Sequence, residues 1–333
     1  MRPFEAVNPD FAIDFSPPVW YTDLTTNPNG SEDNTMENFK GSFQKYEGGP
    51  VFGGPEIGTV FDAYVWKQDG RLRMDISWRP KKSLAVTFSD DGIHWEAPQI
   101  TLSCEAPREW ENHINRNCVM PNPIGDGYLM WYTAQRWEGT VGKSRICIAH
   151  SRDGLHFERL HEEPILIPEA DFEDQSVMNP FVLFENGVFR MWYAAGETYE
   201  PNVICYAESK DGIHWVKDSR SPIFTCAPEN EYEQNRIGAV QVMKEEDGYL
   251  MFYIGYRDLD TACICAARSK DGITDWRRVP ENPLVTPTPE EWDADSCYKP
   301  AVIRDADGLY HIWYNGRRKY DEYIGYAYGK LKP

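Results

Sequence analysis

A strand pattern followed by a tight turn is the most regular feature of the chain. Residues 203–209 form an alternating stretch that leads into Ser209-Lys210-Asp211-Gly212 and then to the aromatic Trp215. This order predicts a strand, a turn in which glycine accepts a positive φ, and the start of the next strand. No stretch keeps a helical period for long, so the pattern favours an all-β protein.

The same pattern recurs along the chain. Its Ser-x-Asp-Gly turns end at Gly92, Gly154, Gly212 and Gly272, about 60 residues apart. Each unit begins with a strand that ends in an acidic-Gly turn, and an aromatic strand follows. A third strand, rich in Cys or Ala, leads into the Ser-x-Asp-Gly turn. A fourth segment, which tends to end in proline and apolar residues, follows the turn. Four antiparallel strands per unit, repeated five times, are typical of a β-propeller.

The predicted architecture is one domain over residues 1–333, a single five-bladed β-propeller with four-stranded antiparallel blades. The blades are expected at about 50–102, 103–167, 168–226, 227–287 and 288–333. The last unit lacks an outer strand, and an open strand edge is a liability. Residues 4–9 resemble the outer strand of the preceding unit and are expected to close the ring. Residues 22–49 show no strand period and are expected to form a loop, which we interpret as a lid over one face.

Composition and charge narrow the range of partners. Hydrophobic residues make up 41% of the chain and aromatic residues 14%, which is typical of a folded globular protein. A net charge of −19 argues against nucleic acid or an anionic membrane as a partner, since both bind basic surfaces. The sequence contains no run of about 18 apolar residues, and its N-terminus lacks the apolar core of a signal peptide. We therefore expect a cytoplasmic protein, and the sequence leaves its oligomeric state open.

The eight cysteines are not spaced as a disulfide framework. Cys147, Cys205 and Cys265 occupy the same position of successive repeats, where the first copy has Ala85. Equivalent positions in separate repeats do not normally contact one another, so these side chains are expected to be small, buried and apolar in character. A reducing cytoplasm agrees with that interpretation.

Candidate site residues follow from the geometry of antiparallel strands. Because neighbouring strands run in opposite directions, the start of a unit's first strand and the loop after its second strand lie on the same face. These positions are expected to share one mouth of a central channel. The candidate substrate-binding residues at this mouth are Glu56, Trp78, Arg79, His113, Arg116, Arg136, Trp137, Asn179, Arg236, Tyr256, Arg257, Tyr298 and Arg317.

The arginines at this mouth allow two interpretations. One is that they bind an anionic substrate group or inorganic phosphate, because a guanidinium matches carboxylate and phosphate oxygens. The other is that they brace neighbouring blades by pairing with carboxylates. The aromatic residues Trp78, Trp137, Tyr256 and Tyr298 suit stacking on sugar faces, and such residues are also common in the interior of propellers.

The Asp-Gly-x-His-Trp turns, the Met-Trp-Tyr strands and the five units resemble the five-bladed propeller glycosidases. This group includes glycoside hydrolase families 43, 32, 68 and 130, and the resemblance extends over residues 50–330. It implies an enzyme that cleaves a glycosidic bond in an oligosaccharide. Such an enzyme acts on a carbohydrate substrate and requires no cofactor. Family 43 places an Asp directly before the first strand of the first blade, and Asp62, followed by Ala63 in place of the usual Pro, matches that placement.

The remaining catalytic groups depart from the family pattern. The resemblance implies further acids at the start of the second and third blades, where this chain has Met120-Pro121 and Asn179-Pro180. Hydrolysis needs an acid that protonates the leaving oxygen and a base or nucleophile opposite it. The candidate catalytic carboxylates are Asp62, Glu197, Asp174 and Asp295. Some family 43 propellers hold a channel metal on a histidine, which here points to His113, although a metal-free site is the main expectation.

Two alternatives to hydrolysis stay open. The phosphorylases of family 130 use one acidic residue as proton donor while phosphate, held by basic side chains, attacks the sugar. Arg116, Arg136, Arg257 and Arg317 would suit that chemistry, although the Asp-Pro-Arg signature is absent from the sequence. A non-catalytic glycan-binding propeller is the other alternative, because the expected acids of the second and third blades are missing and a fold alone does not establish an activity.

Overall fold

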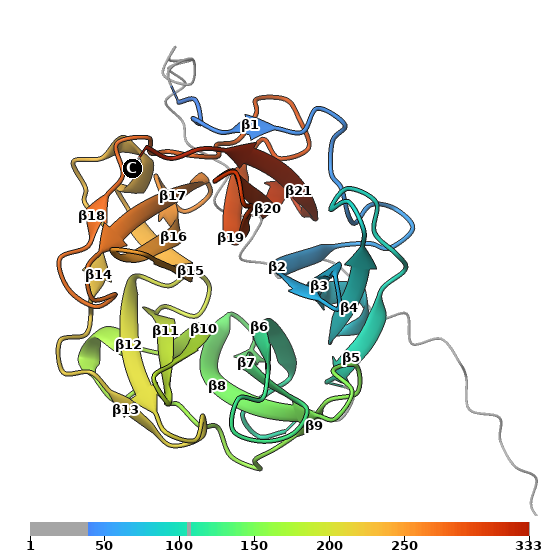
Figure 1. Ribbon diagram of the computed structural model, residues 1–333, viewed down its shortest axis with the longest axis vertical. Coiled ribbons are helices and arrows are strands. Elements are labelled where there is room, and N and C mark those ends of the chain that lie inside the picture. The colour runs from blue at the N-terminus through green and yellow to red at the C-terminus, as the bar shows by residue number, and fades with distance from the viewer. Residues whose placement is uncertain (1–38, 105–107, 333) are drawn as a thin grey trace, which may run out of the picture.

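The computed structural model describes residues 39–104 and 108–332, and strands dominate it. Figure 1 shows these strands in groups around a central axis. In the first two groups, strands that are consecutive in the sequence pair antiparallel. The first group contains β2 (Val60–Gln68), β3 (Arg71–Trp78), β4 (Ser83–Ser89) and β5 (Gln99–Ser103). The second contains β6 (His113–Pro121), β7 (Tyr128–Glu138), β8 (Val141–Ser151) and β9 (Glu158–Arg159). The prediction of an all-β protein is confirmed.

The later groups repeat the same antiparallel order. One contains β10 (Ser176–Glu185), β11 (Val188–Gly196), β12 (Val203–Ser209), β13 (Trp215–Lys217) and β14 (Phe224–Thr225), and the next contains β15 (Arg236–Glu245), β16 (Gly248–Tyr256), β17 (Ala262–Ser269) and β18 (Arg277–Arg278). The last contains β19 (Ser296–Arg304), β20 (Tyr310–Arg318), β21 (Asp321–Gly329) and β1 (Gln44–Lys45). Short 3-10 turns occur at η3 (Arg79–Lys81), η4 (Asp171–Glu173) and η5 (Glu231–Glu233). The first strands contact one another in the order β2, β6, β10, β15 and β19, and β19 contacts β2.

The Ser-x-Asp-Gly turns are built by side-chain hydrogen bonds to the backbone. In the first of them Asp91 Oδ1 accepts the N–H groups of Ile93 and His94 at 2.9 and 2.8 Å, and Ser89 Oγ accepts the N–H of Gly92 at 2.9 Å. Hydrogen bonds from His94 hold the pKa of Asp91 well below its usual range. The turns at Asp153, Asp211 and Asp271 repeat these bonds. The turn residues therefore shape the backbone.

Tryptophans of three second strands connect their group to a turn of the next group. Trp131 Nε1 donates to the carbonyl of Gly212 at 2.9 Å and Trp192 Nε1 to that of Gly272 at 2.7 Å. Trp313, near the end of the chain, donates to Gly92 near its beginning at 2.8 Å. A Cβ on Gly92 would lie 2.6 Å from Trp313 Cζ2, so only glycine allows this approach. These bonds join the second group to the third, the third to the fourth, and the last to the first.

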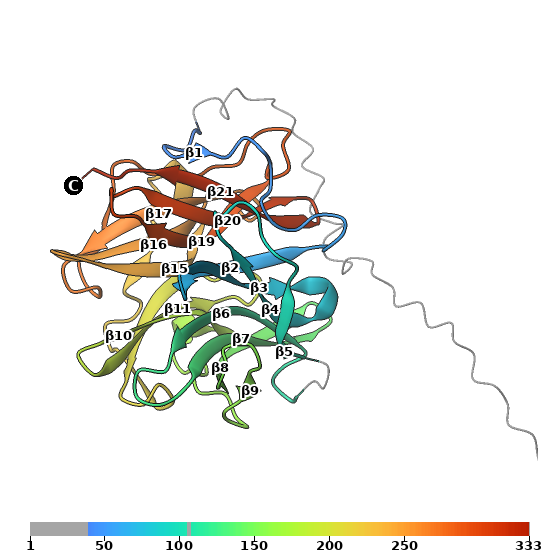
Figure 2. The ribbon, with the colours of Figure 1, turned by 45° about the vertical axis from the view of Figure 1, so that its right-hand side comes forward.

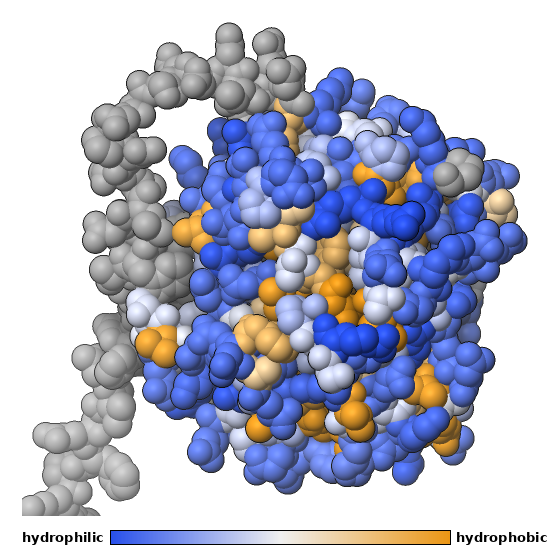
Figure 3. Space-filling view, turned by 90° about the vertical axis from the view of Figure 1, so that its left-hand side faces the viewer, coloured by the Kyte–Doolittle hydropathy of each residue, from blue (hydrophilic) through white to orange (hydrophobic). Residues whose placement is uncertain are grey.

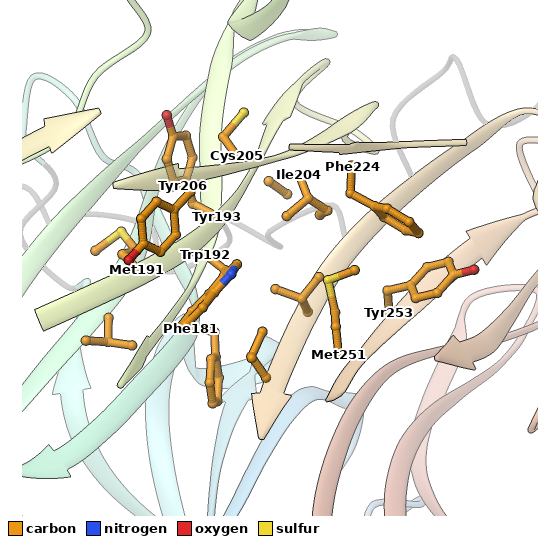
Figure 4. Packing of buried hydrophobic residues seen from close by; sticks show 14 of the residues in the cluster. Phe181, Met191, Trp192, Tyr193, Ile204, Cys205, Tyr206, Phe224, Met251 and Tyr253 are labelled. Carbon is orange, nitrogen blue, oxygen red and sulfur yellow. The ribbon is translucent and has the colours of Figure 1, made fainter. Parts of the chain in front are cut away.

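The hydrophobic core lies between the groups. Figure 4 shows part of it, where the Phe224 ring of one group lies against Tyr253 of the next with ring centroids 5.0 Å apart. Trp192 is fully buried there and contacts Tyr206 at a centroid distance of 5.3 Å. All eight cysteines are free, and each of them except Cys226 is buried. The expectation of small buried cysteines is thus confirmed for the repeat positions.

The outer edge of the last group is covered by an early segment of the chain. In β1, Gln44 and Lys45 pair antiparallel with Tyr328 and Ala327 of β21, and Figure 2 shows β1 beside that strand. This strand lies inside the segment 22–49, which was expected to form only a loop, so that expectation is wrong at these two residues. The predicted closing strand at residues 4–9 lies outside the described residues, as does most of the predicted lid.

The molecular surface is mainly polar. Figure 3 shows the side that carries β18 and β14 as mostly hydrophilic, with hydrophobic residues in separate areas between polar ones. Within residues 39–104 and 108–332, no helix has both the length and the apolar character needed to cross a bilayer.

Candidate functional site

A β-bulge interrupts the first strand of every group at the same place. The pairing register shifts there, and one non-glycine residue adopts a left-handed backbone conformation. Bulges of this kind re-aim side chains and are common beside active sites. The five bulge residues are Asp62 (φ 58°), Arg116 (φ 55°), Asn179 (φ 56°), Ala239 (φ 27°) and Lys299 (φ 49°).

The predicted mouth geometry is confirmed by the strand register. Val60 at the start of β2 pairs with Trp78 at the end of β3, and Arg236 pairs with Tyr256 in the same way. Ser296 likewise pairs with Arg317. The start of each first strand and the end of each second strand therefore share one face, and the bulge residues lie just inside it.

Asp62 is a buried carboxyl with a cationic neighbour. Its side chain is 1% exposed, and Arg116 Nε lies 3.3 Å from its Oδ1. Ser77 Oγ donates to its Oδ2 at 3.2 Å. Burial raises the pKa of Asp62, while the charges of Arg116 and Lys299 oppose that effect. The structure thus places the leading sequence candidate in a desolvated, charged environment.

The bulge backbone is held by polar side chains of the preceding group. The N–H of Arg116 donates to Ser77 Oγ at 3.0 Å, and that of Asn179 donates to Thr133 Oγ1 at 3.0 Å. The N–H of Asp62 donates to Asn315 Oδ1 at 3.0 Å, across the junction between the last and first groups. These side chains occupy equivalent positions of β3, β7 and β20. They fix the directions in which the bulge side chains point.

Glu200 is a second buried carboxyl, which the sequence analysis did not identify. It is 8% exposed, and its Oε2 accepts a hydrogen bond from the hydroxyl of Tyr256. Burial raises the pKa of Glu200, while Arg116 is the strongest of the charges that oppose it. The pKa of Arg116 is raised because, although burial alone would lower it, the charges of Asp62 and Glu200 outweigh that effect. One guanidinium therefore interacts with both carboxyls.

The other three candidate catalytic acids lie outside this buried site. The carboxylate of Glu197 is 55% exposed and pairs with Arg236 at 3.1 Å. Asp174 is exposed and accepts a hydrogen bond from the neighbouring Gln175 side chain at 3.3 Å. Asp295 is partly exposed and accepts the backbone N–H of Lys319. Their predicted catalytic role has no geometric support, because none of them shares the environment of Asp62.

The candidate arginines are engaged with acceptors, and Arg79, Arg236 and Arg317 reach carboxylates of a neighbouring group, as the bracing interpretation predicted. Arg79 pairs with Glu322 at 2.8 Å, and Arg317 donates to the carbonyl of Asp260 at 2.8 Å. Arg136 and Arg257 lie farther out and pair with exposed carboxylates, Glu138 at 3.4 Å and Glu231 at 3.4 Å. Arg136 also lines a surface depression of about 460 Å³ together with Trp110 and Lys143. Glu322, which is 7% exposed, is a further buried acid that the sequence analysis missed.

The remaining candidates divide between the interior and the rim. Tyr256 and Tyr298 are buried and pack with Ala239. Trp78 and Trp137 are partly exposed, and their indole N–H groups donate to Ile57 O and Gln135 Oε1. Glu56 is exposed, and so is His113, whose Nδ1 lies 2.9 Å from Asn112 Oδ1. In the part of the chain that the structure describes, no three His, Cys, Asp or Glu side chains form a cluster that could hold a metal.

Several buried amide groups near the bulges have open hydrogen-bonding capacity. Within the described residues, no partner is present for either side-chain polar atom of Asn117, for Oδ1 of Asn179 or for Nδ2 of Asn315. Buried polar atoms are normally paired with protein or water. Asn315 lies beside Asp62, whose N–H its Oδ1 accepts, and Asn117 follows Arg116 in the chain. Amide groups are neutral hydrogen-bond donors and acceptors.

Sequence comparisons relate the chain to known proteins. The profile of the glycosyl hydrolases family 32 N-terminal domain matches residues 85–222. The uncharacterized protein Rv1502 of Mycobacterium tuberculosis (strain ATCC 25618 / H37Rv) is 31% identical over 267 residues, which cover 78% of this chain and 84% of that protein. A 1,2-beta-oligomannan phosphorylase of Thermoanaerobacter sp. (strain X514) is 30% identical over 135 residues, 37% of this chain and 44% of that protein.

A solved structure described as a glycoside hydrolase has a similar fold. It superposes with a TM-score of 0.70 at 18% sequence identity, and the match covers 90% of this chain and 94% of that structure.

Proposed function

The chain belongs to the β-propeller glycosidase group, and we propose that it is a glycoside hydrolase that cleaves an oligosaccharide in the channel of a five-bladed propeller. The resemblance inferred from the sequence is confirmed at the level of this group. Support for five blades comes from the five equivalent bulges and from the bonds that join the last group to the first, Trp313 to Gly92 and Asp62 to Asn315. The group's shared activity is the cleavage of glycosidic bonds.

The observation that carries the proposal is the pair of buried carboxyls, Asp62 and Glu200, that share Arg116. Two carboxyls whose environments differ are the usual basis of glycoside hydrolysis. Burial raises the pKa of both carboxyls, but Asp62 has the guanidinium of Arg116 within ion-pairing distance, which opposes that effect and favours its ionised form. Within the described residues, the carboxyl of Glu200 forms no ion pair, and burial favours its protonated form.

We assign Glu200 as the general acid and Asp62 as the base or nucleophile. Glu200 donates its proton to the oxygen that leaves with one part of the glycan, as the bond between that oxygen and the anomeric carbon breaks. Asp62 acts on the opposite side of the sugar, where it either removes a proton from the attacking water or bonds to the anomeric carbon first. The open amide groups of Asn117, Asn179 and Asn315 supply hydrogen bonds to sugar hydroxyls.

The alternative of a non-catalytic propeller depended on missing carboxylates. Glu200 supplies a second buried carboxyl from the loop after β11, so the site does not lack one. Phosphorolysis is the second candidate function, and its support is the phosphorylase relative together with the cationic residues around Asp62. It requires inorganic phosphate in the assay and releases a sugar 1-phosphate.

The test is turnover of a library of oligosaccharides and 4-nitrophenyl glycosides by the full chain, with and without phosphate. Glu200→Gln and Asp62→Asn should each lower kcat by about 100-fold or more. Glu197→Gln is the matched control, because this exposed neighbour should leave kcat unchanged. Wild-type turnover with full activity in both site variants would overturn the assignment of the residues, and turnover only with phosphate would favour phosphorolysis.

A further inference from the structure

Lys299 is a buried cation without a partner in the part of the chain that the structure describes. It is the bulge residue of β19 and is 5% exposed. Within residues 39–104 and 108–332 its ammonium forms no hydrogen bond and no ion pair. An unpaired buried charge is costly, so a side chain retained in this state calls for a partner from outside the protein chain.

The surroundings of Lys299 place it beside the proposed catalytic carboxyl. Burial lowers the pKa of Lys299, the charge of Asp62 opposes that effect, and the charge of Arg116 adds to it. Asp62 and Arg116 are bulge residues of the first two groups, while Lys299 belongs to the last. The contact of β19 with β2 brings these bulges together at the inner end of the mouth.

The other cations around this mouth already have acceptors. Arg116 pairs with Asp62 at 3.3 Å, and Arg79 pairs with Glu322 at 2.8 Å. The guanidinium of Arg236 contacts Glu197 at 3.1 Å and the carbonyl of Glu200 at 2.9 Å. Arg317 contacts Asp260 through both its carbonyl and its carboxylate. Among the buried cations of this mouth that the structure describes, Lys299 is therefore the one whose charge is left for a ligand.

The charge balance decides what kind of ligand fits. One unpaired ammonium matches one negative charge, as a carboxylate carries, whereas a phosphate dianion calls for a second unpaired cation. The open amide groups of Asn179 and Asn315 offer neutral hydrogen bonds of the kind that sugar hydroxyls make. A sugar that carries both hydroxyls and one carboxylate uses all of these groups.

We propose that Lys299 binds the carboxylate of an acidic sugar, so that the enzyme acts on glycans containing a uronic acid or another carboxylated sugar at the cleaved bond. This inference rests on the proposed function, because it names the substrate class of the same site. The ammonium then forms a charge-assisted hydrogen bond with the carboxylate, which removes the cost of leaving it unpaired.

Binding is tested by calorimetric titration of the full chain with neutral hexoses, the corresponding hexuronates and inorganic phosphate. The wild type should bind at least one hexuronate about tenfold or more tightly than the matching neutral hexose. Lys299→Met should abolish that preference, because it should weaken binding of the hexuronate much more than binding of the neutral sugar. Lys210→Met is the matched control, because Lys210 is an exposed residue of an outer turn.

The outcomes separate this inference from the proposed function. Equal affinity of the wild type for acidic and neutral sugars would overturn the role of Lys299, even if glycoside turnover depends on Asp62 and Glu200. Binding of phosphate that is lost in Lys299→Met would overturn it in favour of phosphorolysis. Lys299→Met should fold with an unchanged or higher Tm, since it removes an unpaired buried charge, and Lys299→Gln repeats the measurement with a polar side chain.

Discussion

The hydroxyl of Ser77 donates a hydrogen bond to Asp62 Oδ2 at 3.2 Å, and Ser77 Oγ itself accepts the backbone N–H of Arg116 at 3.0 Å. A single side chain of β3 thus orients both the carboxyl of Asp62 and the backbone that carries the partner guanidinium. Ser77 is 1% exposed, so no solvent competes for these bonds. We conclude that Ser77 positions the Asp62–Arg116 pair.

Ser77→Ala should lower kcat by about tenfold, because Asp62 loses one of the groups that fix its direction and stabilise its ionised form. It should also lower the free energy of unfolding by about 1–2 kcal/mol, since the N–H of Arg116 loses its acceptor. Kinetics and urea unfolding measure the two effects. Ser83→Ala is a matched control, because Ser83 is equally buried and its hydroxyl has no hydrogen-bond partner within the described residues. Equal effects of both substitutions on kcat would contradict a positioning role.

Tyr256→Phe should move one limb of the pH–activity profile. The hydroxyl of Tyr256 donates to Glu200 and lowers its pKa, so removing it raises the pKa of the proposed acid further. An acid must be protonated to act, and its activity is lost as pH rises through its pKa. The alkaline limb of kcat/KM should therefore shift to higher pH.

The control for that shift is Tyr253→Phe. The Tyr253 hydroxyl also donates to a buried carboxylate, Glu233, at 2.8 Å, but that pair belongs to the core between groups and not to the mouth. This variant should leave the pH profile in place. A shift of the alkaline limb to lower pH in Tyr256→Phe would exclude Glu200 as the acid.

The repeat made the strand groups predictable, because the same turn chemistry occurs at Asp91, Asp153, Asp211 and Asp271 and a sequence pattern carries that chemistry completely. The covering of the last group by β1 was not predictable, since two residues are too short to show a strand period. Pairing there depends on where the chain happens to pass beside β21.

The site was predictable only where it depends on strand position. Asp62 follows from its place at the start of β2, whereas Glu200 lies in a loop. Between Glu197 and Glu200 the burial alternates in the structure, with Thr198 and Glu200 inside. The sequence Glu-Thr-Tyr-Glu has no matching alternation of polar and apolar residues, so it carries no local signal for the burial of Glu200. The unpaired state of Lys299 depends on side chains of other groups and leaves no trace in the local sequence.

The tryptophan bonds between groups should differ in their contribution to stability. The carbonyl of Gly212 accepts hydrogen bonds from the indoles of both Trp131 and Trp215. The carbonyl of Gly272 accepts one from the indole of Trp192. The indole of Trp276 does not donate to it and has no partner within the described residues. Trp192→Phe therefore leaves a carbonyl without its indole donor, and Trp131→Phe does not.

We expect Trp192→Phe to cost about 1–3 kcal/mol more than Trp131→Phe in the free energy of unfolding, because an unpaired buried acceptor adds to the packing loss that both share. Chemical unfolding of the two variants measures the difference directly. Equal losses would show that packing, rather than the indole hydrogen bond, connects these groups.

The turn carboxylates should make stability depend on acid pH. Hydrogen bonds from Thr274 and Ile273 outweigh burial and lower the pKa of Asp271 to about 2. A carboxyl whose folded-state pKa is depressed contributes stability above its unfolded pKa and loses it as pH falls toward the folded pKa. Asp271→Asn should therefore destabilise the protein at pH 7 and do so much less near pH 2. Chemical unfolding at several pH values measures this dependence, and Asp307→Asn is the control because Asp307 is exposed. A loss of stability in Asp271→Asn that is equal at every pH would attribute the effect to turn geometry and not to charge.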